Sequence, residues 1–356
     1  MYTKIIRPLL FKLSPERVHR LTVGALRLAG AVPGGRWLLR KCYTFTHPSL
    51  EREVFGIKFP NPIGLAAGFD KNAEVCDTLS ALGFGFVEIG TVTPKPQPGN
   101  PKPRLFRLPQ DKAIINRMGF NNDGVERVVQ NLRNRDRRII VGGNIGKNTL
   151  THNDAAAADY LKLFRKLYEH VDYFVVNISC PNVADIRSLQ QKERIVSLLD
   201  GLFDFRRGQN RYRPILLKIS PDLPDDVIDD MVDVMIETPL DGIVAANTTV
   251  SREGLASSPG EIAAIGNGGL SGAPLTERSI EIVRRVHERC NGSYPIIGVG
   301  GVMSPEDARR MLEAGASLVQ VYSGMIYEGP GFAKKICKHL AASRAEGAAP
   351  EAGKQE

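Results

Sequence analysis

Cys180 is the residue of this sequence best suited to proton abstraction. It closes a short apolar run and is followed by Pro181, which would turn the chain and present the thiol at the end of a strand. The ordinary pKa of a thiol is about 8.5, so a thiolate there could act as a general base. The competing interpretation is a buried, inert cysteine, and no adjacent histidine or aspartate indicates a protease-like dyad.

Lys218 is a second candidate because it interrupts the apolar segment Ile215–Ile219. Burial of a lysine is costly unless the ammonium meets an anion. A fixed cation would stabilise the negative charge that a flavin ring gains near N1 and O2 on reduction. A buried salt bridge to an acid is the alternative, and we favour the ligand.

Amide side chains form a third group of candidates. They offer paired donors and acceptors, which a small ring bearing carbonyl and N–H groups would need. Lys71 would supply the charge for a carboxylate, although each amide alone is typical of a turn. The amide residues are Asn116, Asn177, Asn182 and Asn247.

Three glycine-rich turns are predicted late in the chain, at Gly268–Gly272, Gly298–Gly301 and Ser323–Gly324. Glycine lets backbone N–H groups approach a phosphate closely. The last two follow the seventh and eighth predicted strands, where barrel enzymes often bind phosphate. A phosphorylated cofactor or substrate is therefore indicated, and the spacing does not match a Rossmann dinucleotide site.

The elements that must position these residues are eight short apolar runs separated by amphipathic stretches. Runs that are apolar throughout are typical of parallel strands buried on both faces. Polar or glycine residues end nearly every run, and in a barrel these ends meet on the catalytic face. We therefore predict an α/β fold, a (β/α)8 TIM barrel, over an open doubly wound sheet. The runs are 62–67, 86–93, 139–146, 173–179, 214–220, 242–248, 295–301 and 317–323.

Residues 1–45 lie outside this alternation and predict a small N-terminal helical extension. Ser14, Pro15 and Glu16 form a helix start, and apolar residues then recur at helical spacing at Val18, Leu21, Ala25 and Leu28. Apolar surface mixed with lysine and arginine suits a helix in a membrane interface, or a helix packed onto the barrel. Residues 46–340 are the predicted barrel, and residues 341–356 a disordered tail.

Composition excludes several classes of protein. The 356 residues carry 47 Lys+Arg against 39 Asp+Glu, a formal charge of +8, but the basic residues are scattered, so no nucleic-acid partner is expected. Five cysteines without a C-x-x-C pair favour a reducing compartment over disulfides or zinc, and no metal is expected. The sequence has no apolar run of eighteen residues, so no transmembrane helix is predicted, and the N-terminus does not resemble a signal peptide.

Seven segments closely resemble dihydroorotate dehydrogenases. The resemblance covers the chain from Met1 to about Leu340, and Ser14–Leu21 is similar to the membrane-associated extension of the class 2, quinone-linked members. The seven segments are 64–71, 88–94, 116–122, 144–148, 247–249, 268–272 and 321–324.

The resemblance implies oxidation of (S)-dihydroorotate to orotate in de novo pyrimidine biosynthesis, with FMN at the barrel mouth and ubiquinone or menaquinone as final acceptor. Cys180 occupies the position of the base that removes the C5 proton, and the C6 hydride would pass to flavin N5. His19 and Arg107 match residues near the family's quinone tunnel. FMN contacts are implied for Ala67, Gly68, Thr91, Asn144, Asn177, Lys218, Ala246, Gly272, Gly301, Tyr322 and Ser323. Substrate contacts are implied for Lys71, Asn116, Arg117, Met118, Gly119, Phe120, Asn177, Asn182, Asn247 and Thr248.

Two residues depart from the class 2 pattern. Cys180 stands where class 2 members usually have serine and class 1 members have cysteine, and Ala246 stands where class 2 members usually have threonine. We expect a monomeric, peripheral protein on the cytoplasmic face of the cell membrane. The alternatives are a soluble class 1-like dehydrogenase that uses fumarate or NAD, and a barrel that binds FMN or membrane without catalysis.

Overall fold

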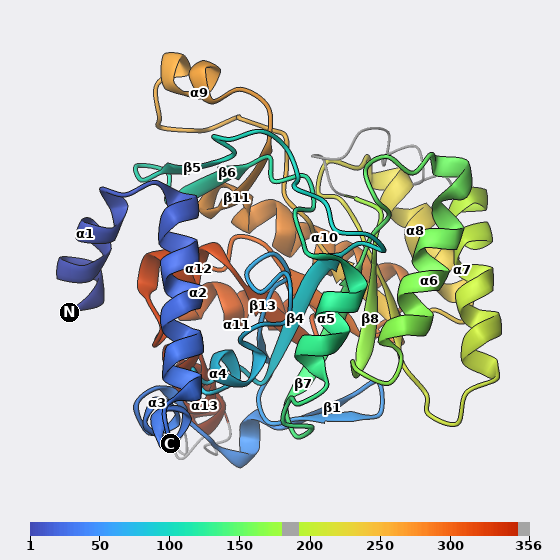
Figure 1. Cartoon of the computed structure of the whole chain (residues 1–356), viewed down its shortest axis with the longest axis horizontal. Coiled ribbons are helices and arrows are strands. Elements are labelled where there is room, and N and C mark those ends of the chain that lie inside the picture. The colour runs from blue at the N-terminus through green and yellow to red at the C-terminus, as the bar shows by residue number, and fades with distance from the viewer. Residues whose placement is uncertain (180–191, 348–356) are drawn as a thin grey trace, which may run out of the picture.

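Eight parallel strands close into a barrel, in the order β10-β12-β13-β3-β4-β7-β8-β9 (Figure 1). The computed structural model describes residues 1–179 and 192–347. Each barrel strand lies inside one of the eight predicted runs, so the predicted barrel is confirmed. The strands are β3 (Ile63–Leu65), β4 (Phe86–Val92), β7 (Ile140–Ile145), β8 (Tyr173–Asn177), β9 (Ile215–Lys218), β10 (Gly242–Ala245), β12 (Ile296–Val299) and β13 (Leu318–Val321).

Helices surround the barrel because each carries one apolar stripe. In α10, for example, Ile280, Val283 and Val286 recur at helical spacing and are buried against the strands. The helices after the strands are α4 (Cys76–Ser80), α5 (Gly124–Leu132), α6 (Ala156–Leu167), α7 (Lys192–Arg207), α8 (Asp225–Glu237), α9 (Pro259–Ile265), α10 (Thr276–Arg289), α11 (Pro305–Glu313), α12 (Ser323–Glu328) and α13 (Phe332–Gly347).

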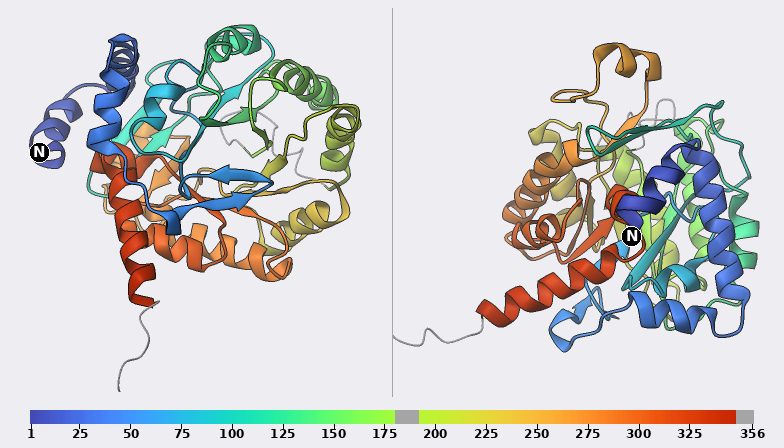
Figure 2. Two further views of the ribbon diagram at one scale, coloured as in Figure 1. Left: turned by 90° about the horizontal axis from the view of Figure 1, so that it is seen from below. Right: turned by 90° about the vertical axis from the view of Figure 1, so that its left-hand side faces the viewer.

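A two-stranded hairpin closes the lower end of the barrel (Figure 2). It consists of β1 (Arg52–Val54) and β2 (Ile57–Phe59), paired antiparallel. Val54 and Phe59 join the apolar cluster of the barrel interior, where the Phe59 ring packs edge-on against Phe86 at 5.3 Å. These side chains thus fill the barrel interior from below.

A small antiparallel sheet covers part of the upper end. It is formed by β5 (Leu105–Leu108), β6 (Ala113–Asn116) and β11 (Gly269–Gly272), with β6 in the centre. The predicted glycine turn at Gly268–Gly272 is therefore wrong, since most of it is a strand. Glycine is needed there for close packing, because a Cβ on Gly272 would lie 2.3 Å from the Lys112 carbonyl oxygen.

The N-terminal extension is helical, as predicted. It comprises η1 (Tyr2–Ile6), α1 (Arg7–Phe11), α2 (Pro15–Ala31) and α3 (Gly35–Tyr43). Val23 and Leu26 of α2 pack against the core, whereas Leu21 and Leu28 of the predicted apolar stripe face outward, 54% and 67% exposed. The extension is therefore both packed on the barrel and apolar on its outer side.

The predicted start of the tail, at residue 341, lies inside helix α13. Helix α13 continues to Gly347, so residues 341–347 are helical rather than disordered. Three of these seven residues are alanine, which has the highest intrinsic helix propensity, and they extend the helix begun by buried residues such as Phe332 and Ile336. The last nine residues lie outside the described part. None of the described helices has the length and apolar character needed to span a bilayer.

Candidate active site

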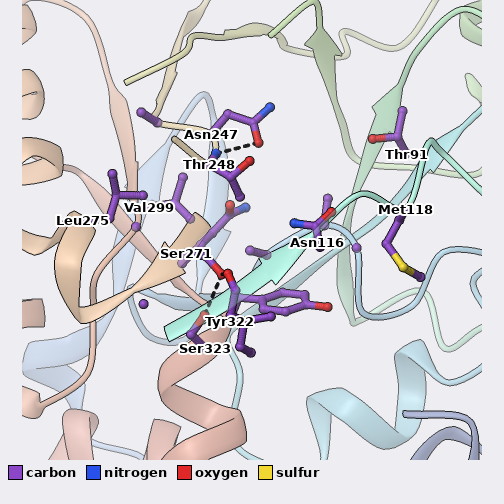
Figure 3. Close-up of a pocket in the computed structure, with 18 of the residues that line it drawn as sticks. Thr91, Asn116, Met118, Asn247, Thr248, Ser271, Leu275, Val299, Tyr322 and Ser323 are labelled. Carbon is purple, nitrogen blue, oxygen red and sulfur yellow. Dashed lines mark hydrogen bonds between the residues drawn. The ribbon is translucent and has the colours of Figure 1, made fainter. Parts of the chain in front are cut away.

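A large cavity opens at the carboxyl ends of the barrel strands, under the sheet of β5, β6 and β11 (Figure 3). Its volume, with the open mouth included, is about 1240 Å³. Its walls come from the barrel strands, from this sheet and from helix α2, so side chains from distant parts of the sequence meet there.

Amides and hydroxyls form one connected network across the cavity floor. Thr91 Oγ1 donates to Asn144 Oδ1 at 2.6 Å, and Asn177 Nδ2 donates to Thr91 Oγ1 at 3.0 Å. Asn247 Nδ2 donates to Ser179 Oγ at 3.0 Å and to Asn177 Oδ1 at 3.3 Å. Because each group is held by a neighbour on another strand, the floor presents fixed donors and acceptors.

A fully buried carboxylate, Glu88, lies beneath this network. It accepts hydrogen bonds from Asn144 Nδ2 at 2.8 Å and from Gln320 Nε2 at 2.5 Å. The ammonium of Lys218 lies 3.9 Å from its Oε1 and also lines the cavity. Lys218 thus has the buried acid that the alternative interpretation expected, and it also lines the cavity, where the predicted ligand would bind.

Lys71 and His19 lie where the cavity meets the extension. Lys71 Nζ donates to the Gly68 carbonyl at 2.8 Å, and burial together with the nearby Arg104 charge lowers its pKa to about 8. His19 Nε2 donates to the Phe69 carbonyl at 2.7 Å, and burial and the Lys71 charge lower its pKa to about 4. At neutral pH the Lys71 ammonium therefore lies near a neutral imidazole.

Hydroxyls and glycines line another end of the cavity. Ser271 Oγ of β11 and Ser323 Oγ, at the start of α12, lie 2.9 Å apart. Gly301 has φ +70°, and a Cβ there would lie 2.2 Å from the Thr276 Cα. The backbone can thus turn closely at this end, where hydroxyl and N–H groups are the usual ligands of a phosphate.

Apolar side chains cover the space between the two ends. Ala66, Val299 and Tyr322 line it, and burial raises the pKa of the Tyr322 phenol to about 12. The Tyr322 ring packs edge-on to Phe69 at 6.4 Å. These walls suit a flat, largely apolar ring system.

The segment Asn116–Phe120 forms the roof of the cavity, where Asn116 and Met118 appear in Figure 3. Asn100 holds it, because its backbone N–H donates to the Met118 carbonyl at 3.1 Å and its Nδ2 to the Arg117 carbonyl at 3.0 Å. The Arg117 guanidinium leaves the cavity, donates to Asn267 O at 3.1 Å and packs over the Phe106 ring. The Arg117 side chain therefore does not line the cavity in which the predicted substrate contact would be made.

Most of the predicted site residues meet in this cavity. Three do not line it: Arg117; Asn144, which acts through Thr91 and Glu88; and Arg107, whose guanidinium donates to the Leu13 carbonyl at 2.9 Å. Cys180 and Asn182 lie outside the described residues. The predicted residues that do line the cavity are His19, Ala67, Gly68, Lys71, Thr91, Asn116, Met118, Gly119, Phe120, Asn177, Lys218, Ala246, Asn247, Thr248, Gly272, Gly301, Tyr322 and Ser323.

Sequence reasoning missed Glu16, Glu88 and Gln320. Glu88 and Gln320 interrupt apolar strands just as Lys218 does, so the same signal could have found them. Glu16 was interpreted only as a helix-start residue, and its position at the cavity depends on how α2 packs on the barrel.

The cavity at the carboxyl ends of the parallel strands contains a cation, an amide network, apolar walls and an end lined by glycines and hydroxyls. This arrangement is typical of enzymes of the α/β-barrel class. Residues 49–343 match the family model for dihydroorotate dehydrogenase. The chain is 52% identical to dihydroorotate dehydrogenase (quinone) of Christiangramia forsetii, over 94% of this chain and 97% of that protein. It is 48% identical to the protein of the same name from Thermobifida fusca, over 96% and 92%.

Solved structures agree with the sequence comparison. The crystal structure of DHODH in complex with ferulenol from Eimeria tenella is similar with a TM-score of 0.81 and 36% identity, over 94% of this chain and 92% of that one. The chain belongs to the dihydroorotate dehydrogenase family, and the predicted class 2, quinone-dependent type is confirmed.

Proposed function

We propose that this enzyme oxidises dihydroorotate to orotate with FMN bound in the cavity, and that a membrane quinone takes the electrons. The single observation that carries the proposal is the composition of the cavity, which combines a carboxylate-binding cation and an amide floor with a glycine-hydroxyl end. Its neighbours by sequence are named as quinone-linked enzymes.

The residues present fit FMN. The Ser271–Ser323 end with Gly301 suits the phosphate, and the apolar walls around Tyr322 suit the isoalloxazine ring. Lys218, 3.9 Å from Glu88, supplies a fixed cation toward the ring. When bound, FMN would supply the acceptor for the hydride that leaves C6 of dihydroorotate, and it would pass the electrons on to quinone.

The protein's own groups orient the substrate. Lys71 pairs with the substrate carboxylate, and Asn116, Asn177 and Asn247 read the carbonyl and N–H groups of the pyrimidine. The hydrogen bonds that tie Asn177 and Asn247 together fix these amides before the substrate enters, so little order is lost on binding. The roof segment Met118–Phe120 excludes water from this end.

Cys180 is the proposed base that removes the proton from C5 of dihydroorotate. This role follows from the family pattern, since Cys180 lies outside the described residues. A thiol is far more acidic than the serine hydroxyl usual in class 2, so turnover should persist to lower pH.

Quinone is proposed to enter beside the extension. His19 lines the cavity from α2, and Arg107 contacts the extension through the Phe11 ring at 4.4 Å and the Leu13 carbonyl. The outward apolar residues Leu21, Leu28 and Trp37 are proposed to lie in the cytoplasmic face of the cell membrane, with the protein as a monomer.

An acceptor screen on the purified, flavin-loaded enzyme tests this proposal. Dihydroorotate oxidation should proceed with ubiquinone or menaquinone analogues and fail with fumarate or NAD. Cys180→Ala should lower kcat by about 10²–10⁴-fold while flavin stays bound. Turnover with fumarate or NAD alone would favour the class 1-like alternative that Cys180 suggested. A flavin-loaded protein inactive with every acceptor would favour a non-catalytic barrel.

A further inference from the structure

One ion pair joins the extension to the roof of the cavity. Glu16, in the first turn of α2, accepts a hydrogen bond from Arg104 Nη2 at 2.9 Å and a longer one from Arg104 Nε at 3.4 Å. Lys102 Nζ also lies 3.6 Å from Glu16, but Lys102 is largely exposed. Arg104 is only 6% exposed, so its pair with Glu16 is partly shielded from solvent.

Arg104 also holds the backbone of the neighbouring loop. Its Nη1 donates to the Pro98 carbonyl at 2.6 Å and to the Asn100 carbonyl at 2.9 Å. Its own carbonyl accepts from the Arg117 N–H at 2.9 Å. One guanidinium therefore ties α2 to a loop whose shape depends on both carbonyl contacts.

That loop in turn positions the proposed substrate segment. Asn100 is bonded to the backbone of Arg117 and Met118, as described above. The packing is tight, because a Cβ on Gly119 would lie 2.7 Å from the Asn100 side chain. A shift of Asn100 must therefore move the backbone at Met118 and Gly119, both of which line the cavity.

The same pair acts on the cation at the cavity mouth. Burial and the Arg104 charge lower the pKa of Lys71, whereas Glu16 and Asp70 raise it. The imidazole of His19 also lies here, and it is neutral at pH 7 because burial and the Lys71 charge lower its pKa to about 4. Glu16 is thus the group through which α2 offsets the repulsion between Arg104 and Lys71.

We propose that Glu16 and Arg104 are positioning residues, a latch through which helix α2 sets the geometry of segment 116–120, and so the affinity for dihydroorotate and orotate. The latch rests on the proposed assignment of this segment and of Lys71 to the substrate. It gives the extension a role in substrate binding in addition to its role at the membrane.

The test compares Glu16→Gln and Arg104→Lys with Arg27→Gln. The control breaks another ion pair between α2 and the barrel, Arg27–Glu74 at 3.1 Å, which does not contact the roof loop. Orotate is titrated into each flavin-loaded, full-length protein and followed by flavin absorbance, and KM and kcat are measured with a soluble dye as acceptor. We expect both latch variants to raise the orotate Kd and the dihydroorotate KM about five-fold or more, with kcat within two-fold and FMN content unchanged. Arg27→Gln should match the unmodified enzyme.

An orotate Kd in Glu16→Gln equal to that of the unmodified enzyme would overturn the latch. An equal loss in Arg27→Gln would also overturn it, since any weakening of α2 would then suffice. A loss of FMN from Glu16→Gln would show that the pair supports folding rather than substrate geometry. If the unmodified protein neither binds orotate nor oxidises dihydroorotate, the proposed function fails instead, and the latch with it.

Discussion

Two regions of the surface are built from amphipathic helices, and their outward faces differ. Along α8 and α10, arginines and aspartates pair across the helices: Arg278–Asp225 at 2.9 Å, Arg285–Asp229 at 2.6 Å and Arg289–Asp233 at 2.8 Å. The extension instead exposes apolar side chains. Ten of the fourteen exposed large hydrophobic residues in the described chain lie within residues 1–38.

The difference shows that packing on a barrel does not by itself determine what a helix carries on its other side. Both regions bury one stripe against the core, as Val23 and Leu26 do in α2 and Ile228 and Val232 do in α8. Only the outer stripe differs, and in the extension it fits the proposed contact with a membrane. Ion pairs suit water, whereas exposed leucine and tryptophan suit a lipid interface.

The largest effect is expected from making the extension's outer face polar. The triple variant Leu21→Glu, Leu28→Glu, Trp37→Glu should bind vesicles containing anionic lipid at least about 100-fold more weakly, because burial of each such side chain contributes about 1.5–3 kcal/mol. Vesicle sedimentation measures this loss.

The matched control changes three exposed apolar residues outside the extension, Leu150, Tyr212 and Ile236, to glutamate. This variant should bind vesicles like the unmodified protein. Equal losses in both triple variants would contradict the assignment of the membrane face to the extension.

An intermediate effect is expected on the pH dependence of substrate binding. The pKa of Lys71 is about 8, so its ammonium is present below pH 8 and is lost as the pH rises through that value. KM for dihydroorotate should therefore rise by up to about ten-fold between pH 7 and pH 9. Steady-state kinetics with a soluble dye acceptor measures the profile.

This pH dependence should change with a substitution in the extension but not with one in the α8–α10 region. Glu16→Gln removes a negative charge that supports the Lys71 ammonium, so the rise in KM should begin at lower pH. Arg285→Ala, in the α8–α10 region, should leave the profile unchanged. A flat profile from pH 7 to pH 9 would contradict the role of Lys71 as the cation for the substrate.

The smallest effect is expected from the ion pairs between α8 and α10. Arg285→Ala removes contacts to Asp225 and Asp229 and should lower Tm by roughly 1–2 °C in low salt, because exposed ion pairs contribute little. The difference should nearly disappear in 1 M NaCl, where charges are screened within about 3 Å. Differential scanning calorimetry at both salt concentrations tests this, and a drop that persists in high salt would indicate packing rather than charge.

The barrel could be predicted from the sequence because its strands are buried on both faces. Buried apolar residues such as Val175 and Leu216 make these strands apolar nearly throughout, and every predicted run contains a strand. The sheet of β5, β6 and β11 escaped prediction because β5 is only partly buried and is interrupted by Arg107, and because β11 contains two glycines. Glycine-rich sequence is typical of turns, and only the partner strand β6 makes this segment extended.

Two kinds of site residue could be predicted: charged residues whose burial in an apolar strand costs free energy, and residues that belong to a family motif. Lys218 was found because a cation within an apolar strand needs an explanation, and Glu88 would have been found by the same argument. Glu16 could not be found in this way, because its role depends on Arg104, which is 88 residues away in sequence. Long-range pairs of this kind require the tertiary fold.

The hairpin of β1 and β2 has a practical consequence. It seals the end of the barrel opposite the cavity, and Lys58 on β2 points into solvent there. A dye or a surface linker attached at Lys58 would hold the enzyme by its underside. The helices proposed to face lipid and the mouth of the cavity would both stay accessible, so the fluorescence of the proposed flavin could be recorded from single immobilised molecules while vesicles and substrate flow past.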